Sequence, residues 1–204
     1  MMSEFDLDIT DELLSTTRAV RKRLDLERPV PRTMITECLR LAVQAPTGGN
    51  RQGWRWLVVT DAKKRAALAD LYRRGAATYL SQGRDDADAR GEKQDVRVFD
   101  SAMYLADHLQ EVPVHVIPCV ENTVGDSAPG TGWAGLFGSI FPAVWNFQLA
   151  LRARGLGSCL TTLHLRHADE AATLLSIPDS MLQVALLPVA YTKGTTFQRA
   201  KRPP

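Results

Sequence analysis

The stretch LAVQAPTGGNRQGWRW, residues 41–56, changes its character halfway along. Its first residues continue an apolar pattern of helical spacing that begins near Pro31, and Pro46 interrupts this pattern. Two glycines and several amide or hydroxyl side chains follow, before the β-rich segment WRWLVVT at residues 54–60. The stretch therefore predicts a helix, a polar loop and a strand in succession. Such a loop is either an ordinary turn or a binding site for a polar ligand.

The rest of the chain continues this alternation of helical and strand patterns. Helices are predicted from Thr10, from Pro31, after Asp61, over residues 135–154 and over 168–177, and strands over 54–60, 112–120, 158–165 and 182–192. Neither an internal repeat nor a low-complexity linker separates them. We therefore predict a single three-layer domain of the α/β or α+β class over residues 1–204.

Two segments stand out within this outline. Residues 83–97 are mostly charged and contain two glycines, which predicts a mobile, exposed excursion that is a candidate substrate lid. The strand over 112–120 contains Pro113 and Pro118. Because proline cannot donate to a sheet ladder, we expect this strand to pair only at an edge or near its ends.

The composition limits the classes of partner. The 204 residues include 25 Lys and Arg against 23 Asp and Glu, so the net charge of +2 provides no overall field for nucleic acid or a membrane surface. Three dispersed cysteines favour a reduced, cytoplasmic protein over a disulfide framework. The acidic N-terminal segment also lacks the basic start and apolar core of a secretory signal.

One uncharged stretch, from Ser127 to Leu151, is long enough to span a bilayer. Its first part is rich in glycine, and Pro142, Asn146 and Gln148 interrupt the remainder. We therefore interpret it as a helix buried between other elements or between subunits, and we expect no membrane partner.

A glycine motif in this stretch suggests a dinucleotide site only superficially. Gly130, Gly132 and Gly135 match the pattern G-x-G-x-x-G. A dinucleotide fingerprint also requires a strand that runs directly into the glycines and an acidic residue about twenty positions later. The sequence predicts a loop before these glycines and has Gly155 at the later position, so we interpret the motif as a loop that enters a helix.

Histidines and cysteines suggest two other kinds of chemistry, and neither pattern is complete. Cys159, His164 and His167 lack a fourth ligand and do not match familiar zinc spacings. Ser139, His164 and Asp169 include the residue types of a catalytic triad, but Ser139 is outside a nucleophile-elbow sequence. We therefore predict no metal site and assign no catalytic side chain.

Basic clusters occur near both ends of the chain, in RAVRKR at residues 18–23 and in QRAKRPP at residues 198–204. Each cluster alone is typical of a solvated surface. Together they are candidates for a phosphate clamp, because guanidinium groups match phosphate oxygens in a bidentate manner.

Taken in order, these segments resemble the nitroreductase family of flavin mononucleotide (FMN) oxidoreductases. TTRAVRKRLDLERPVP resembles that family's basic N-terminal segment, LAVQAPTGGNRQGWRWLVV its polar loop and following strand, and GSIFPAVWNFQLALRARGLGSCLTT its long helix and Gly-Leu-Gly-Ser segment. The resemblance implies an α+β fold, a three-layer α/β/α sandwich with a mainly antiparallel central sheet. It also implies an intertwined homodimer with FMN at the subunit interface.

The resemblance assigns the site residues to FMN binding. The residues implied on the phosphate side are Arg18, Val20, Arg21, Lys22, Lys201 and Arg202. The residues implied at the ring and ribityl chain are Pro46, Thr47, Gly48 and Asn50 of the other subunit, together with Thr161, Thr162 and Leu163, which would offer backbone hydrogen bonds.

The sequence departs from the family pattern at three positions. Gly53 replaces a proline before Trp54, Val20 replaces a common phosphate-binding serine, and Trp145 stands where glutamine is common. The loss of the serine hydroxyl leaves phosphate binding to the basic side chains, and it allows a weaker affinity for flavin.

The family's reaction is a ping-pong transfer of hydride from NADH or NADPH through FMN to a nitroaromatic, a quinone or a similar electron-poor small molecule. Other flavin chemistry is an alternative, either reductive dehalogenation or cleavage of the flavin itself. A non-catalytic flavin-binding or storage protein is a further alternative. No acid or base from the protein is required for the first of these reactions.

Overall fold

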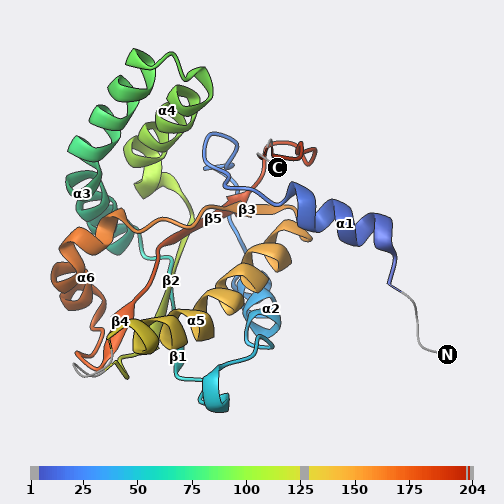
Figure 1. Ribbon diagram of the computed structural model, residues 1–204, viewed down its shortest axis with the longest axis vertical. Helices are drawn as coiled ribbons and strands as arrows, with labels where there is room; N and C mark the ends of the chain where they lie inside the picture. The colour runs from blue at the N-terminus through green and yellow to red at the C-terminus, as the bar shows by residue number, and fades with distance from the viewer. Residues whose placement is uncertain (1–4, 125–128, 201, 203–204) are drawn as a thin grey trace.

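The computed structural model describes residues 5–124, 129–200 and 202. A five-stranded antiparallel sheet lies at the centre with helices packed on both of its faces (Figure 1). The strands are β1 (Trp54–Val59), β2 (Val114–Glu121), β3 (Leu156–Ser158), β4 (Met181–Gln183) and β5 (Leu187–Tyr191). Their order is β1-β2-β5-β3, and β4 also pairs with β2. The predicted α+β, three-layer class is confirmed.

Six α-helices and three short 3₁₀ helices complete the described part of the chain. The α-helices are α1 (Leu7–Thr16), α2 (Arg32–Ala42), α3 (Ala62–Ala89), α4 (Lys93–His108), α5 (Pro129–Arg152) and α6 (Ala168–Leu175). The 3₁₀ helices are η1 (Gly48–Asn50), η2 (Leu109–Glu111) and η3 (Leu163–His167). Asp61 caps α3 by accepting from the Lys64 N–H, as predicted, whereas Asp6 rather than Thr10 caps the first helix.

Two hydrophobic clusters form the core, one on each face of the sheet. Alternate side chains of β2 enter them: Ile117 and Cys119 join the cluster with α3, α4 and α6, while Val116 and Val120 join the cluster with α2 and α5. The two faces of the sheet therefore carry different helices, and this separation also divides the candidate functional residues.

The prediction of a mobile excursion over residues 83–97 is wrong. These residues form the end of α3, a turn at Gly91 with φ +70°, and the start of α4 (Figure 1). Gly83 allows the Phe99 ring to pack directly against the α3 backbone, and Arg84 donates to Asp100 at 2.9 Å. The charges lie on the solvated faces of a packed helical hairpin. A charged composition is compatible with an exposed loop and with the exposed face of a helix, so composition alone did not separate the two.

The prediction that residues 112–120 form an edge-like strand is also wrong. β2 pairs with β1 on one side and with both β4 and β5 on the other. Pro118 lies between the segment that pairs with β4 and the segment that pairs with β5, and its carbonyl oxygen accepts from the Val184 N–H at 3.0 Å. An interruption of the ladder thus accommodates the missing N–H inside the sheet.

The same interruption divides the predicted strand over 182–192 into β4 and β5. The predicted strand over 158–165 is mostly absent, because regular pairing ends at Ser158. Thr161 then forms an isolated bridge to Leu186, and the chain turns into η3. A single segment thus contributes a short strand, an exposed backbone edge and a 3₁₀ helix.

The long apolar helix begins earlier than predicted, so the three glycines of the G-x-G-x-x-G pattern lie inside α5. Among the described residues, only this helix, over Gly130–Arg152, is long and apolar enough to cross a membrane, and 44% of its most apolar window is buried in the protein. The face of α5 that is turned away from the sheet carries a stacked row of aromatic rings, formed by Trp133, Phe137 and Phe141. Trp145 lies farther along the helix.

Candidate functional site

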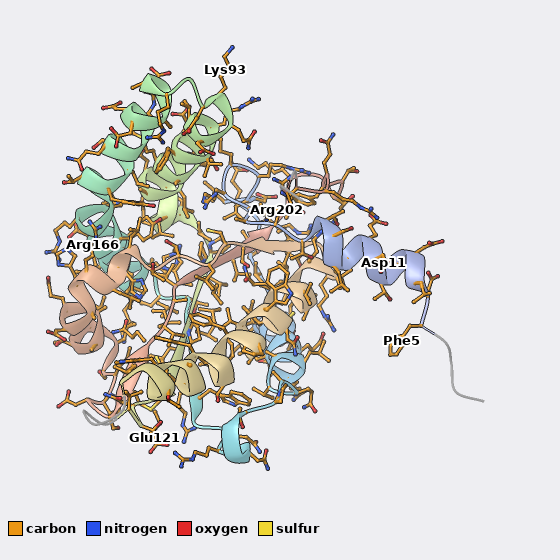
Figure 2. All side chains as sticks on the ribbon, viewed as in Figure 1. Phe5, Asp11, Lys93, Glu121, Arg166 and Arg202 are labelled. Carbon is orange, nitrogen blue, oxygen red and sulfur yellow. The ribbon has the colours of Figure 1, made fainter. Side chains whose placement is uncertain are left out.

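The two basic ends of the chain meet in the structure. The Arg18 guanidinium donates to the carbonyl oxygen of Gln198 at 3.0 Å, and Arg23 donates to the carbonyl oxygens of Lys193 and Thr196 at 2.9 Å each. Arg23 also lies 4.1 Å from the ring centroid of Phe197. We call this arrangement the terminal clasp, and Figure 2 shows Arg202 on the same side of the molecule.

The terminal clasp concentrates positive charge. Among the described residues, Arg18, Lys22 and Arg202 form no ion pair with an acidic side chain, and all three are exposed. Lys201, the other predicted phosphate contact, lies outside the described residues. The prediction that the two basic ends come together is borne out by these contacts, and the surface they form is suited to an anion.

Val20 has a structural role that the sequence did not reveal. Its side chain is only 4% exposed, and its N–H donates to the carbonyl oxygen of Ser158 at 2.9 Å. A Cβ on Gly157 would lie 3.0 Å from the Val20 Cβ, so valine and glycine pack against each other. The structure therefore places the Val20 side chain in the core rather than on an anion-binding surface.

A hollow of about 680 Å³ lies between α3, α4 and η3. Arg21, Thr161, Thr162 and Leu163 all border it, as does Tyr72. The Thr161 hydroxyl donates to the Tyr72 oxygen at 3.1 Å. Four of the predicted site residues thus share one surface, which we call the α3–η3 hollow.

The backbone at this hollow has unused donors. The N–H groups of Thr162 and Leu163 have no hydrogen-bond acceptor within residues 5–124, 129–200 and 202. Gly75 fixes the position of this backbone, because a Cβ there would collide with the Leu163 carbonyl oxygen. The close approach of α3 to η3 therefore holds two N–H groups at the rim of the hollow.

The polar loop that follows α2 borders a second hollow, of about 350 Å³. Thr47 and Gly48 line it together with Ser139 of α5, whose Oγ accepts from the Gly48 N–H at 3.0 Å. Gly49 and Asn50 have φ values of +60° and +53°, so both lie in the left-handed region, which glycine and asparagine adopt more readily than other residues. We call this the loop hollow. Pro46 and Asn50 are exposed next to it.

A local contact at this hollow explains why glycine occupies position 53. Its carbonyl oxygen accepts from the Glu121 N–H at 2.9 Å, and an added Cβ would lie 3.3 Å from the Glu121 side chain. Glu121, whose side chain is labelled in Figure 2, itself borders the loop hollow. The departure from proline therefore leaves room for a carboxylate beside the loop.

One chain does not bring the two groups of predicted residues together. The loop hollow lies against α5 and the sheet face that carries α2, whereas the α3–η3 hollow lies on the face that carries α3 and α4. Figure 1 shows η1 far from η3 and from the terminal clasp. A ligand that contacts both groups must therefore lie between two copies of the chain.

The buried titratable groups are neutral near pH 7. Burial lowers the pKa of both His115 and His164 to about 4, raises the pKa of Cys159 to about 11, and raises the pKa of Tyr72. Ser139 bonds to Gly48 and Gly135, while His164 has no hydrogen-bond partner among the described residues, so the triad pattern is not assembled. The described residues also include no group of three or more metal-ligating side chains.

Sequence reasoning did not assign three of the residues that border these hollows. They are Tyr72 of α3, Arg166 of η3 and Ser139 of α5. The stretch from Tyr79 to Tyr104 was expected to shape a pocket, and Tyr79 and Phe99 do line the α3–η3 hollow. The spacing of Tyr72 and Tyr79 along one helical face is a signal that was available. Arg166 carried no comparable signal, because its position depends on where the strand pairing ends.

Comparison with known proteins places the chain in a family. The family model described as "Nitroreductase family" matches residues 14–191. The 5,6-dimethylbenzimidazole synthase of Rhodospirillum rubrum is 31% identical over 192 residues, covering 91% of this chain and 83% of the synthase. The iodotyrosine deiodinase of Thermotoga neapolitana is 26% identical over 179 residues, covering 87% and 86% of the two chains.

A solved structure gives the same fold. It is oxidised iodotyrosine deiodinase bound to FMN and 3-iodo-L-tyrosine, with a TM-score of 0.71, 24% identity and 95% coverage of each chain. The fold, with helices on both faces of an antiparallel sheet, and the family match over most of the sequence define the class. The chain belongs to the nitroreductase family.

Proposed function

We propose that this chain is an FMN-dependent oxidoreductase that works as a homodimer. The observation that carries the proposal is that predicted site residues border two separate hollows on opposite faces of the sheet. Thr47 and Gly48 border the loop hollow, and the α3–η3 hollow is bordered by Arg21, Thr161, Thr162 and Leu163. Two copies related by a two-fold axis would place the loop hollow of one against the α3–η3 hollow of the other. Each of the two composite sites would then draw residues from both chains.

The exposed face of α5 supports this assembly. Trp133, Phe137 and Trp145 are 39%, 37% and 43% exposed, and the Trp133–Phe137 and Phe137–Phe141 rings stack at 5.6 and 5.4 Å. Solvent-facing aromatic rows of this kind mark interaction surfaces. A second copy would cover this row and extend the helical layer.

The residues present fit FMN. Arg18, Lys22 and Arg202 would hold the phosphate, and the N–H groups of Thr162 and Leu163 would donate to acceptor atoms of the ring. Val20 offers no hydroxyl to the phosphate, so the basic side chains carry that contact alone. When bound, FMN would accept hydride from NADH or NADPH and pass it to an electron-poor acceptor in a second half-reaction.

In this reaction the protein would position FMN and adjust the reactivity of its ring. The two N–H donors, fixed by the contact of Gly75 with Leu163, would stabilise negative charge on the ring. Tyr72 and Cys159 stay neutral at pH 7 because burial raises their pKa values, so neither supplies a charge that opposes this effect. No acid or base from the chain is required.

A second candidate is flavin chemistry without a nitroaromatic or quinone acceptor. The identities to a deiodinase and to 5,6-dimethylbenzimidazole synthase favour either reductive dehalogenation or flavin cleavage as that alternative. A storage protein without catalysis is a third. A cytoplasmic location is part of the main proposal, since Cys38, Cys119 and Cys159 are unpaired and buried.

The first test is the visible spectrum of the purified protein, with the released chromophore identified and the mass measured by light scattering. Absence of FMN, both as purified and after incubation with excess FMN, contradicts the proposal. Anaerobic mixing of the yellow protein with NADH or NADPH then separates the candidates. Bleaching followed by turnover with a nitroaromatic or quinone supports the main one, and iodide release or oxygen-dependent loss of FMN supports the second.

A further inference from the structure

The α3–η3 hollow contains more positive charge than FMN binding explains. Arg21 and Arg166 both border it, and no aspartate or glutamate does so among the described residues. The remaining lining is apolar, aromatic or hydroxyl-bearing, and it includes Tyr79, Phe99 and Leu160. A concave surface that has two arginines and no carboxylate favours ligands that carry negative charge.

The Arg166 guanidinium is held in place but keeps donors for a ligand. Its Nη1 donates to the carbonyl oxygen of Gly75 at 2.9 Å, and its carbon Cζ lies 5.8 Å from the ring centroid of Tyr79. Within the described part of the chain it forms no ion pair with an acidic side chain, and Figure 2 shows it where η3 passes α3. Its other N–H groups are therefore available for a bidentate contact.

The two arginines occupy different ends of the hollow. Arg21 lies near Tyr72 and Cys159, whose pKa values it affects, whereas Arg166 lies near Tyr79. Tyr72 and Tyr79 are two turns apart on α3, about 10 Å along the helix axis. If the Arg21 end receives FMN, as the proposed function requires, Arg166 remains at the outer end.

The outer end of the α3–η3 hollow is lined by side chains that suit the binding of a planar ring. Tyr79 and Phe99 meet edge to face, with ring centroids 6.1 Å apart, and Val98 and Leu160 are exposed apolar side chains at the same hollow. The volume of about 680 Å³ is in the range of ligand sites. An aromatic ring would pack between these walls while a charged substituent meets Arg166.

We infer that the acceptor of this enzyme is a planar aromatic carboxylate and that Arg166 binds its carboxylate. The inference rests on the proposed function, because it places the acceptor beside FMN. A charge-assisted bidentate contact is stronger than a neutral hydrogen bond, so the carboxylate is favoured over an uncharged analogue of the same shape. A free amino acid is disfavoured, since no carboxylate in the described hollow receives its ammonium group.

The test uses two non-reacting probes of equal shape, benzoate and benzamide, titrated calorimetrically into the oxidised, FMN-loaded protein at pH 7. We expect benzoate to bind about tenfold more tightly than benzamide, and we expect salt to reduce this preference. Arg166→Gln should remove the preference, and Arg166→Lys should keep part of it. Arg97→Gln, at an exposed arginine of α4 that does not border the hollow, should leave it unchanged.

Turnover supplies a second measurement. With 4-nitrobenzoate and 4-nitrobenzamide as acceptors, Arg166→Gln should raise the KM for the carboxylate about tenfold and leave kcat and the KM for the amide nearly unchanged. Equal affinities in the wild-type protein, or a preference that survives in Arg166→Gln, overturn the inference while FMN binding stands. Absence of FMN overturns the proposed function and the inference together.

Discussion

The backbone N–H of Gly48 donates to the Oγ of Ser139 at 3.0 Å, and the same hydroxyl donates to the carbonyl oxygen of Gly135 at 2.7 Å. One serine therefore ties the polar loop to the long helix α5. The loop and the exposed aromatic row are connected through this side chain, so the position of the loop depends on the helix that we propose as the dimer interface.

Replacement of Ser139 tests this connection. Ser139→Ala should raise the Kd for FMN about two- to tenfold, because it removes one hydrogen bond that orders the loop. The free energy of unfolding should fall by less than about 1 kcal/mol, since the site is partly exposed. Fluorescence titration of FMN and urea unfolding measure the two quantities.

Ser81→Ala is the matched control for that change. Ser81 donates to the carbonyl oxygen of Ala77 in α3, an equivalent back-bond that carries no loop. If both variants bind FMN alike, the Gly48–Ser139 contact does not support the cofactor.

Charge reversal tests the phosphate clamp. Arg18→Glu combined with Arg202→Glu should weaken FMN binding at least about a hundredfold, because two charge-assisted contacts become repulsive. Equilibrium dialysis with FMN measures the change. Arg40→Glu combined with Arg97→Glu makes the same change in net charge at exposed positions away from the clasp and should bind FMN normally. Unchanged binding in the first pair would place the phosphate elsewhere.

A charge within the aromatic row tests the assembly. Phe137→Asp should convert the dimer to a monomer in sedimentation experiments and should release FMN, since the row would no longer be covered by a second copy. Val58→Asp places the same charge at an exposed apolar residue of β1 and should remain dimeric. A dimeric, FMN-retaining Phe137→Asp protein would refute this interface.

Two buried histidines predict that acid destabilises the fold. The pKa of His115 and of His164 is about 4 in the folded protein because of burial, below the ordinary value of 6.5. The unfolded chain binds more protons between these values, so the free energy of unfolding should fall as the pH decreases from about 6.5 to 4, by up to about 3 kcal/mol for each histidine.

Unfolding by urea at a series of pH values measures this dependence. His164→Leu removes a ring whose two nitrogens have no partner among the described residues, and it should flatten the profile in the same pH range. His108→Leu, at a half-buried surface histidine paired with Glu111, should leave the profile steep. Equal slopes for wild type and His164→Leu would show that His164 does not contribute.

The positions of most helices and strands could be predicted from the sequence, because hydrophobic periodicity and turn residues determine local structure. The helix, polar loop and strand around Pro46 are found where expected, and Gly155, just after the end of the long helix, has the left-handed φ of +75° that glycine commonly adopts at such a position. The two basic ends were also expected to lie together, and the hydrogen bond from Arg18 to the carbonyl oxygen of Gln198 joins them.

The errors arise where tertiary contacts override local patterns. The charged residues 83–97 become helical because Phe99 packs on Gly83, and Pro118 becomes internal because the sheet ladder is interrupted beside it. Arg166 was not predicted for a related reason: its place follows from the approach of η3 to Gly75. No local pattern encodes contacts between segments so far apart in the chain.

The terminal clasp also bears on how the protein is made. Arg18 and Gln198, which are hydrogen-bonded, are separated by 180 positions, so nearly the whole chain is synthesised between them. During translation the basic N-terminal segment emerges long before the tail that completes its surface. The surface that we propose for the FMN phosphate can therefore form only after residue 198 has been synthesised, later than the six helices α1 to α6 that precede it in the sequence.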